Sequence, residues 1–190
     1  PHLDSSKSFV ASRPLRGMEH AHEILILTQD RPELFARIVS NLQQYGLSIA
    51  EARIHTGRDG RVVDSFIVVE EFARFQEILA EKLDLAEKLP PPLRGRPSRQ
   101  SKLFPISPQA SLRPDAAGKQ YMLSIVTTDR LGLLASIARV FVKYGINLVT
   151  ARITTLGERA EDVFLIESAK LRDPVFCAEF EKAVLEALEL

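Results

Sequence analysis

The residues TQDRPELFARI at 28–38 and TTDRLGLLASI at 127–137 decide the fold, because they are two copies of one pattern. A threonine, the Asp-Arg pair, a leucine, an alanine and an isoleucine recur at equivalent positions. The likeness extends further, so that residues 24–56 match residues 123–155, after which the register slips by one residue in a turn, where duplicated folds tolerate insertions. A repeat of this length predicts two copies of one small domain.

Each copy contains the same order of strand and helix patterns. Short apolar runs at 24–27 and 123–126 are followed by apolar residues at helical spacing, which predicts a strand and then an amphipathic helix. A glycine follows each helix, and the next residues have the pattern of a two-stranded hairpin. Helices at about 72–88 and 174–188 complete a β-α-β-β-α order. The predicted fold class is α+β, with two ferredoxin-like (βαββαβ) domains in tandem.

The repeat also divides the chain. The second copy ends directly after its last helix and therefore lacks its own C-terminal strand. Two short extended segments in the linker, near 103–106 and 109–113, are expected to complete the sheets, one in the first domain and the other along the open edge of the second. The predicted segments are an irregular N-terminal stretch (1–20), a first domain (21–89), a Pro- and Arg-containing linker (90–119) and a second domain (120–190).

Composition narrows the function classes. Lys+Arg and Asp+Glu both number 25, so the net charge is zero, and we expect no nucleic-acid partner and no membrane partner. Cys177 is the single cysteine, which excludes an internal disulfide and favours the reducing cytoplasm. No apolar run approaches the roughly 20 residues that span a bilayer. The chain begins at Pro1 rather than at a methionine, which we interpret as a piece of a longer protein.

The sequence offers no pattern for catalysis. The four histidines do not have metal-ligand spacing with carboxylates, and the chain has no glycine-rich phosphate loop, strand-elbow serine or cysteine with a plausible base. We therefore expect no catalytic residue, no metal and no cofactor in this chain, and we look for a binding function instead.

The loop at 129–134 is the strongest candidate for binding a small ligand. Asp129 is expected to cap the following helix, and Gly132 leaves its backbone N–H groups accessible to the carboxylate of an amino acid. Asn147 opens the neighbouring strand, and its amide is expected to reach the same loop. The alternative is that Asp129 is only a cap and Asn147 only a turn residue. The candidate ligand-binding residues are Thr127, Asp129, Arg130, Gly132, Leu133 and Asn147.

The first copy departs from this pattern. Pro32 and Glu33 stand where the second copy has leucine and glycine, which makes the loop more crowded and more negative, and Ser48 stands where the second copy has Asn147. Both residues fit the start of a helix, so the fold is expected to survive. We expect an asymmetric pair, in which the second copy supplies the main ligand loop. The weaker first-repeat counterpart consists of Asp30, Arg31 and Ser48.

These motifs resemble a known family. The Asp-Arg-x-Gly-Leu-Leu loop, the YGIN sequence at 144–147 and the hairpin sequence GERAED at 157–162 resemble the C-terminal ACT repeats of bifunctional uridylyltransferase/uridylyl-removing enzymes, which modify the nitrogen signal protein PII. The resemblance covers about residues 20–190. The loop motif alone occurs in many ACT domains, whereas the hairpin together with two repeats in this order is far more specific.

The resemblance implies a division of labour. In that family, a nucleotidyltransferase domain uses Mg²⁺ to transfer UMP from UTP to a tyrosine of PII, and an HD phosphohydrolase domain removes it. Neither catalytic domain is in this chain. The ACT pair is the expected glutamine sensor: L-glutamine would bind at or near the interface of the two repeats and bias the catalytic domains by about 1–3 kcal/mol.

Three alternatives use the same residues differently. The chain could be a stand-alone ACT module, or the regulatory end of another enzyme, that binds a different amino acid. It could be a docking or dimerisation module that binds no ligand and forms a homodimer. RNA binding would need aromatic side chains exposed on the central strands, where the sequence offers Phe66 and Phe164, at positions that suit the core equally well.

Overall fold

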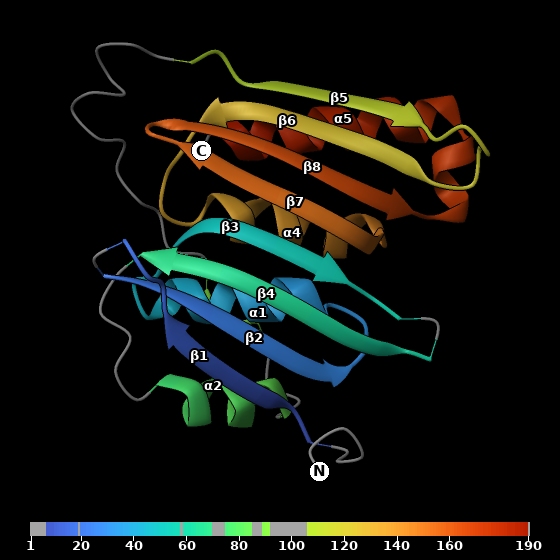
Figure 1. Ribbon diagram of the computed structural model, residues 1–190. Helices are drawn as coiled ribbons and strands as arrows, with labels where there is room; N and C mark the ends of the chain where they lie inside the picture. Colours follow the sequence, from blue (N-terminus) through green and yellow to red (C-terminus); the bar gives the residue numbers. More distant parts are fainter. Residues whose placement is uncertain are drawn as a thin grey trace.

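The structure is a computed structural model that describes residues 7–18, 20–57, 59–69, 75–84, 89–91 and 106–189. Within these residues, one antiparallel sheet of eight strands runs in the order β1-β2-β4-β3-β7-β8-β6-β5, with the helices along one face (Figure 1). The first half comprises β1 (Phe9–Pro14), β2 (Ala21–Gln29), α1 (Leu34–Gln44), β3 (Ser48–His55), β4 (Arg61–Val69) and α2 (Phe75–Asp84). The second comprises β5 (Gln109–Pro114), β6 (Tyr121–Thr128), α4 (Leu133–Tyr144), β7 (Asn147–Leu156), β8 (Arg159–Glu167), the 3₁₀ turn η1 (Ala169–Arg172) and α5 (Pro174–Glu189).

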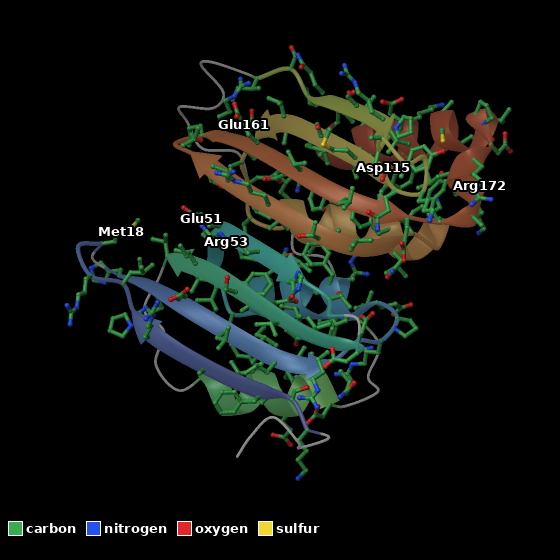
Figure 2. The ribbon with its side chains drawn as sticks, turned by 45° about the vertical axis from the view of Figure 1, so that its right-hand side comes forward. Met18, Glu51, Arg53, Asp115, Glu161 and Arg172 are labelled. Atoms are coloured by element: carbon green, nitrogen blue, oxygen red, sulfur yellow. The ribbon has the colours of Figure 1, made fainter. Side chains whose placement is uncertain are left out.

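One face of the sheet is buried under the helices and the other is open. Side chains alternate along β8, so that Phe164 is fully buried whereas its neighbour Val163 is 38% exposed. The open face carries exposed charged side chains such as Glu51, Arg53 and Glu161 (Figure 2). This alternation is typical of an antiparallel sheet with one solvated face. The predicted α+β class, with two ferredoxin-like domains in tandem, is confirmed.

The two repeats are joined by their inner strands. β3 of the first repeat pairs antiparallel with β7 of the second, with Arg53 opposite Arg152 near the centre of the ladder. The hydroxyl of Thr150 donates a hydrogen bond of 2.6 Å to the carbonyl oxygen of Ile54 across the same junction. Backbone pairing therefore makes one continuous sheet out of two domains, with no edge left open between them.

The hydrophobic core also crosses the junction. Helices α1 and α4 contact each other, and the ring of Phe164 in the second repeat lies between two other rings. Its centroid is 6.3 Å from that of Phe35 in the first repeat and 5.4 Å from that of Phe141 in its own repeat, both edge-on. Edge-to-face pairs of this kind stabilise a core beyond simple burial. The two repeats therefore share one core.

The outer strands correct one prediction and confirm another. The segment 1–20 was predicted to be irregular, yet it contains β1, which pairs with β2 and forms the edge of the first repeat. β5 pairs with β6 at the edge of the second repeat, as predicted for the strand near 109–113. Most of the other expected linker strand, near 103–106, lies outside the described residues, and Ile106 is not in a strand. Both edge strands therefore precede their own repeats.

The N-terminal strand was missed because its burial pattern is weak. Among its residues only Val10 is buried, so the period-2 signal is nearly absent. A further signal was available: β1 ends at Arg13-Pro14 and β5 ends at Arg113-Pro114, so the internal repeat begins earlier than the core pattern does. Proline at the end of an edge strand is well tolerated because its missing N–H faces no partner.

We predict that the two repeats unfold together. Phe164→Ala should lower the free energy of unfolding by about 3–5 kcal/mol, because it removes a buried ring that touches both repeats. Val163→Ala, on the open face one residue away, should cost less than about 1 kcal/mol. Urea unfolding followed by circular dichroism checks both values. Two separate transitions in the unsubstituted protein would contradict a shared core.

Candidate functional site

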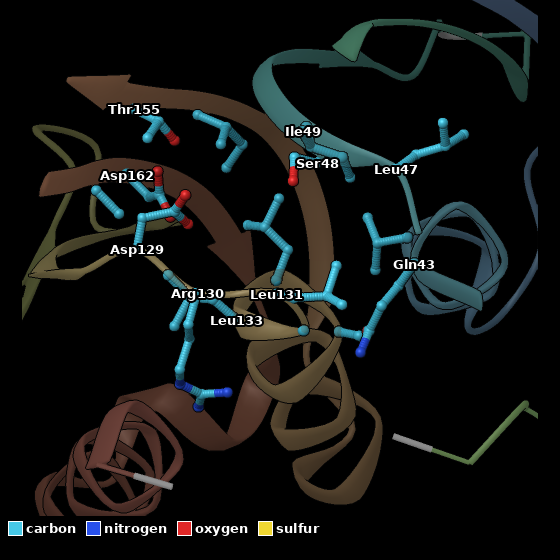
Figure 3. A pocket seen from close by; sticks show the side chains of 16 residues that line it. Gln43, Leu47, Ser48, Ile49, Asp129, Arg130, Leu131, Leu133, Thr155 and Asp162 are labelled. Atoms are coloured by element: carbon cyan, nitrogen blue, oxygen red, sulfur yellow. The ribbon is translucent and has the colours of Figure 1, made fainter. Parts of the chain in front are cut away.

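Two clefts lie at the junction of the repeats, and the internal repeat relates them. The narrow cleft is formed by the second repeat's loop at 129–132 with Asp162, facing Gln43 and Ser48 of the first repeat. Its volume is about 40 Å³, which holds only a few water molecules. Figure 3 shows Leu131 in the middle of this cleft, between the two repeats.

The wide cleft is the counterpart on the other side of the junction. It is formed by the first repeat's loop at 30–33 with Asp64, facing the end of α4 and Asn147 of the second repeat. Its volume is about 470 Å³, within the range of small-molecule sites. Pro32, exposed and shorter than leucine, occupies the position of Leu131. This substitution accounts for part of the difference in volume.

The clefts exist because β3 and β7 run antiparallel. His55, at the end of β3, lies opposite Thr150, so the beginning of each of these strands lies near the end of the other. The turn after β7 is also tied to the loop at 129–132 of its own repeat, since the backbone N–H of Asp129 donates to the carbonyl of Glu158 at 2.8 Å. The loop at 129–132 therefore faces Ser48, the first residue of β3. The loop at 30–33 faces Asn147, the first residue of β7.

This pairing changes the predicted assignment of Asn147. Asn147 was expected to reach the loop of its own repeat, but it lies in the wide cleft with Asp30, and Ser48 lies in the narrow cleft with Asp129. The side-chain amide of Asn147 donates to Oε1 of Glu167 at 3.1 Å, and the residue is exposed. The prediction was wrong because it considered contacts within one repeat only.

The helix starts differ from the expected caps. Asp129 was predicted to cap α4, but the N-cap residue is Gly132, with a φ of 91° and no side-chain cap. The N-cap of α1 is Glu33, which adopts the same left-handed conformation with a φ of 65°. A non-glycine residue in this region is strained by about 1 kcal/mol or more. Both repeats therefore keep the same loop backbone, although only the second has the glycine that favours it.

The remaining predicted residues divide between the clefts and the core. Leu133 lines the narrow cleft and Arg31 the wide one. Thr127 is buried within β6 and lines neither cleft. The guanidinium of Arg130 points away from the narrow cleft in Figure 3 and donates to the carbonyl oxygen of Ala187 at 2.7 Å. Arg130 therefore fastens the loop to the C-terminal end of α5, where a cation is favourable.

Two buried aspartates were missed from the sequence. Asp64 on β4 and Asp162 on β8 occupy equivalent positions, and each is only 1% exposed. Both face inward at positions where the strands otherwise carry apolar residues, for example between Val62 and Phe66. An acidic residue at the inward positions of an alternating strand is the signal that would have found them.

Burial dominates the protonation of both aspartates. Burial raises the pKa of Asp64 from 3.8 to about 7, against the opposing hydrogen bond from the backbone N–H of His55 at 3.2 Å, and the charge of Asp30 adds to the rise. The pKa of Asp162 is likewise raised to about 7 by burial, opposed by the backbone N–H of Thr154 and reinforced by Asp129. Each cleft therefore contains an acid close to its titration point at neutral pH.

The neighbouring carboxyl groups of Asp129 and Asp162 are not part of a metal-ligand cluster within the described residues. Figure 3 shows the carboxyl groups of Asp129 and Asp162 next to each other at one end of the narrow cleft. Burial raises the pKa of Asp129 as well. Among the described residues, no group of three or more His, Cys, Asp or Glu side chains is arranged to hold a metal ion.

None of the described helices has the length and apolar character needed to cross a membrane.

The fold and the paired clefts define a module of two α+β repeats joined into one sheet. Residues 121–175 match the family model of the ACT domain. The chain also matches part of an aspartate kinase from Synechocystis, with a TM-score of 0.51 and 16% identity over 90% of this chain and 27% of that one. At this identity the likeness shows the fold alone.

The sequence relatives are more specific. The chain is 40% identical to the bifunctional uridylyltransferase/uridylyl-removing enzyme of Burkholderia lata over 196 residues, which covers 98% of this chain and 23% of that protein. It is also 40% identical to the enzyme of the same description from Bordetella pertussis, covering 92% of this chain and 22% of that protein. The chain therefore spans less than a quarter of the length of these relatives. The resemblance inferred from the loop and hairpin motifs is confirmed.

We predict that the two buried aspartates reduce stability above neutral pH. Because their folded-state pKa is raised, the native state holds protons that the unfolded state has lost, so the free energy of unfolding should fall between about pH 4 and pH 7 and then level off. Asp64→Asn and Asp162→Asn should each raise the free energy of unfolding at pH 8 by roughly 2–4 kcal/mol and flatten this slope.

Urea titrations of both variants from pH 4 to 8 measure the effect. Asparagine keeps an oxygen that can accept the backbone N–H and does not ionise, so the pH-dependent part of the difference reports the ionisation of the aspartate. Equal free energies of unfolding of variant and parent at pH 8 would show that burial does not raise the pKa of these aspartates.

Proposed function

We propose that this chain is the amino-acid-sensing part of a uridylyltransferase/uridylyl-removing enzyme and that its effector is L-glutamine. The observation that carries the proposal is that each cleft is built by both repeats, with the start of a helix from one and the start of a strand from the other. A helix start offers backbone N–H groups to a carboxylate. The 40% identity to these enzymes supports the choice of parent.

The wide cleft has the features that an amino acid needs. Its volume of about 470 Å³ accommodates a small ligand, and the start of α1 supplies N–H groups for a carboxylate. The amide of Asn147 donates to Glu167, which leaves its carbonyl oxygen to accept from a ligand N–H. The narrow cleft keeps the glycine-containing loop on which the sequence prediction rested, but its volume of about 40 Å³ is too small for an amino acid.

The signal follows from the position of the clefts. A ligand that contacts both repeats favours the arrangement in which its cleft is best formed, and it biases the rest of the protein by its difference in affinity between the two arrangements. In the parent enzyme, the receivers are the nucleotidyltransferase domain, which uses Mg²⁺, and the phosphohydrolase domain. Their common substrate is PII, in the cytoplasm. High glutamine would favour removal of UMP, and low glutamine its addition.

The alternatives differ in what they need from the structure. An ACT module for another amino acid would use the same clefts and differ only in ligand. A docking or homodimerisation module would use the exposed sheet face and the outer strands and would leave the clefts empty. RNA binding would need Phe66 and Phe164 on the surface, but both are fully buried under the helices, which argues against it.

We predict saturable binding of L-glutamine to the purified chain in isothermal titration calorimetry, with L-glutamate and L-asparagine binding more weakly. When an analogue cannot form the hydrogen bonds that the site forms with the side-chain amide of glutamine, buried polar groups of the protein are left without a partner, and the analogue binds more weakly. Asn147→Ala should weaken binding roughly tenfold, because it removes a hydrogen-bonding group of the wide cleft.

Ser48→Ala provides the matched control, since Ser48 is the repeat equivalent of Asn147 in the narrow cleft. Loss of binding in Ser48→Ala alone would move the main site to the narrow cleft, as the loop sequence had suggested. The absence of glutamine binding in the unsubstituted chain would favour the docking module.

A further inference from the structure

Asp64 is a buried acid that forms no ion pair within the described part of the chain. It lines the wide cleft, it is 1% exposed, and its Oδ1 accepts from the backbone N–H of His55 at 3.2 Å. Its repeat equivalent, Asp162, has the same arrangement, and there Oδ2 is buried with no hydrogen-bond partner at all. A buried carboxyl oxygen without a partner is costly and calls for an explanation.

The charges around Asp64 are mostly negative. From its own repeat, Asp30, Arg31 and Glu33 line the same cleft, and Asp30 is the charge that raises the pKa of Asp64 further. The lining residues from the second repeat carry no charge, and they include Asn147. The equivalent of Arg31 in the second repeat is Arg130, whose guanidinium is held at the end of α5, away from its cleft. In the wide cleft the three carboxyl groups of Asp30, Glu33 and Asp64 therefore outnumber the one guanidinium, that of Arg31.

Stability alone does not explain these aspartates. A neutral asparagine of the same shape would accept the same backbone N–H and avoid the penalty of burying an acid. The fold nevertheless carries the acid at the same inward position in both repeats, and in each it lies at the wall of a cleft. A group that lowers stability where a ligand would bind is typical of a functional site.

We propose that Asp64 receives the ammonium group of the effector in the wide cleft, and that this contact couples effector binding to release of a proton. The inference rests on the proposed amino-acid sensing and adds the residue that recognises the α-ammonium group. The start of α1 holds the ligand carboxylate, so the two ends of the zwitterion are recognised by opposite sides of the first repeat's loop.

An ammonium group fits this site better than a metal ion. The wide cleft offers the carboxyl groups of Asp30, Glu33 and Asp64, but they do not converge into a group that could hold a metal. Mg²⁺ and Ca²⁺ need six or more oxygen ligands at short distances. An ammonium group needs only two or three acceptors, and Asp64 and the side-chain oxygen of Asn147 both line this cleft.

The proton balance follows from the chemistry. The protonated carboxyl group of Asp64 gives its proton to solvent, and the resulting carboxylate pairs with the ligand ammonium, whose own protons stay in place. Only the ionised fraction of Asp64 is competent to bind, and the apparent affinity scales with that fraction. With a pKa of about 7, the ionised fraction falls roughly tenfold between pH 8 and pH 6.

The test is calorimetric titration of the chain with L-glutamine at pH 6 and pH 8, and at pH 7 in both phosphate and Tris. We expect affinity to be roughly tenfold weaker at pH 6 than at pH 8. At pH 7, a fraction of one proton is released for each ligand bound and is taken up by the buffer. The heats in the two buffers should therefore differ by that fraction of the difference between the protonation enthalpies of the buffers. 4-Carbamoylbutanoate, which is glutamine without its ammonium group, should not bind detectably.

Two variants assign the effect to a residue. Asp64→Asn should weaken glutamine binding at pH 8 and abolish both the pH dependence and the proton release, although the variant is more stable than the parent. Asp162→Asn is the matched control and should retain all three properties. His55 is an exposed neighbour with a titratable side chain, and the Asp64→Asn comparison separates its contribution from that of Asp64.

Each other outcome has a definite meaning. Equal glutamine affinity at pH 6 and pH 8, or an Asp64→Asn variant that binds as the parent does, overturns the role of Asp64 and leaves the proposed function standing. An effect of Asp162→Asn alone also overturns it and places the ammonium site in the narrow cleft. If the parent chain binds no glutamine at any pH, the proposed function fails and this inference fails with it.

Discussion

The antiparallel pairing of β3 with β7 is the contact on which the rest of the structure depends. It merges two four-stranded sheets into one, brings α1 against α4, and lets Phe35 of the first repeat reach Phe164 of the second. It also sets the loop before each helix against the first strand residue of the other repeat. Without this pairing, each repeat would supply only one wall of each cleft, and neither cleft would be complete.

Stability and recognition make opposite demands on these clefts. Asp64 and Asp162 are buried acids whose pKa is raised to about 7, and Glu33 occupies a left-handed conformation that suits glycine. Each feature lowers the stability of the fold, and each lies at a cleft wall or loop rather than in the rest of the core. The shared aromatic core tolerates these losses because it is common to both repeats. This balance fits the proposed sensing function, because a ligand would have to change the energy of a structure that is already folded.

The sequence predicted the elements well and the contacts between repeats poorly. The repeated pattern at 28–38 and 127–137 was sufficient for the fold class and for the inner strands and helices. β1 was missed because its only buried residue is Val10. Asn147 was assigned to the wrong loop because periodicity describes one repeat at a time, and the partner of a sheet edge is a property of the assembled structure. Asp64 was visible as an acid at an inward position but was not recognised as such.

Hydrogen–deuterium exchange with and without L-glutamine tests most directly whether a ligand binds between the repeats. The account predicts slower exchange in two segments that are distant in sequence, the loop at 30–36 and the residues 145–148, because both line the wide cleft. The two segments should respond at the same glutamine concentration. Protection confined to one repeat, or spread over the open face of the sheet, would contradict a site built by both repeats.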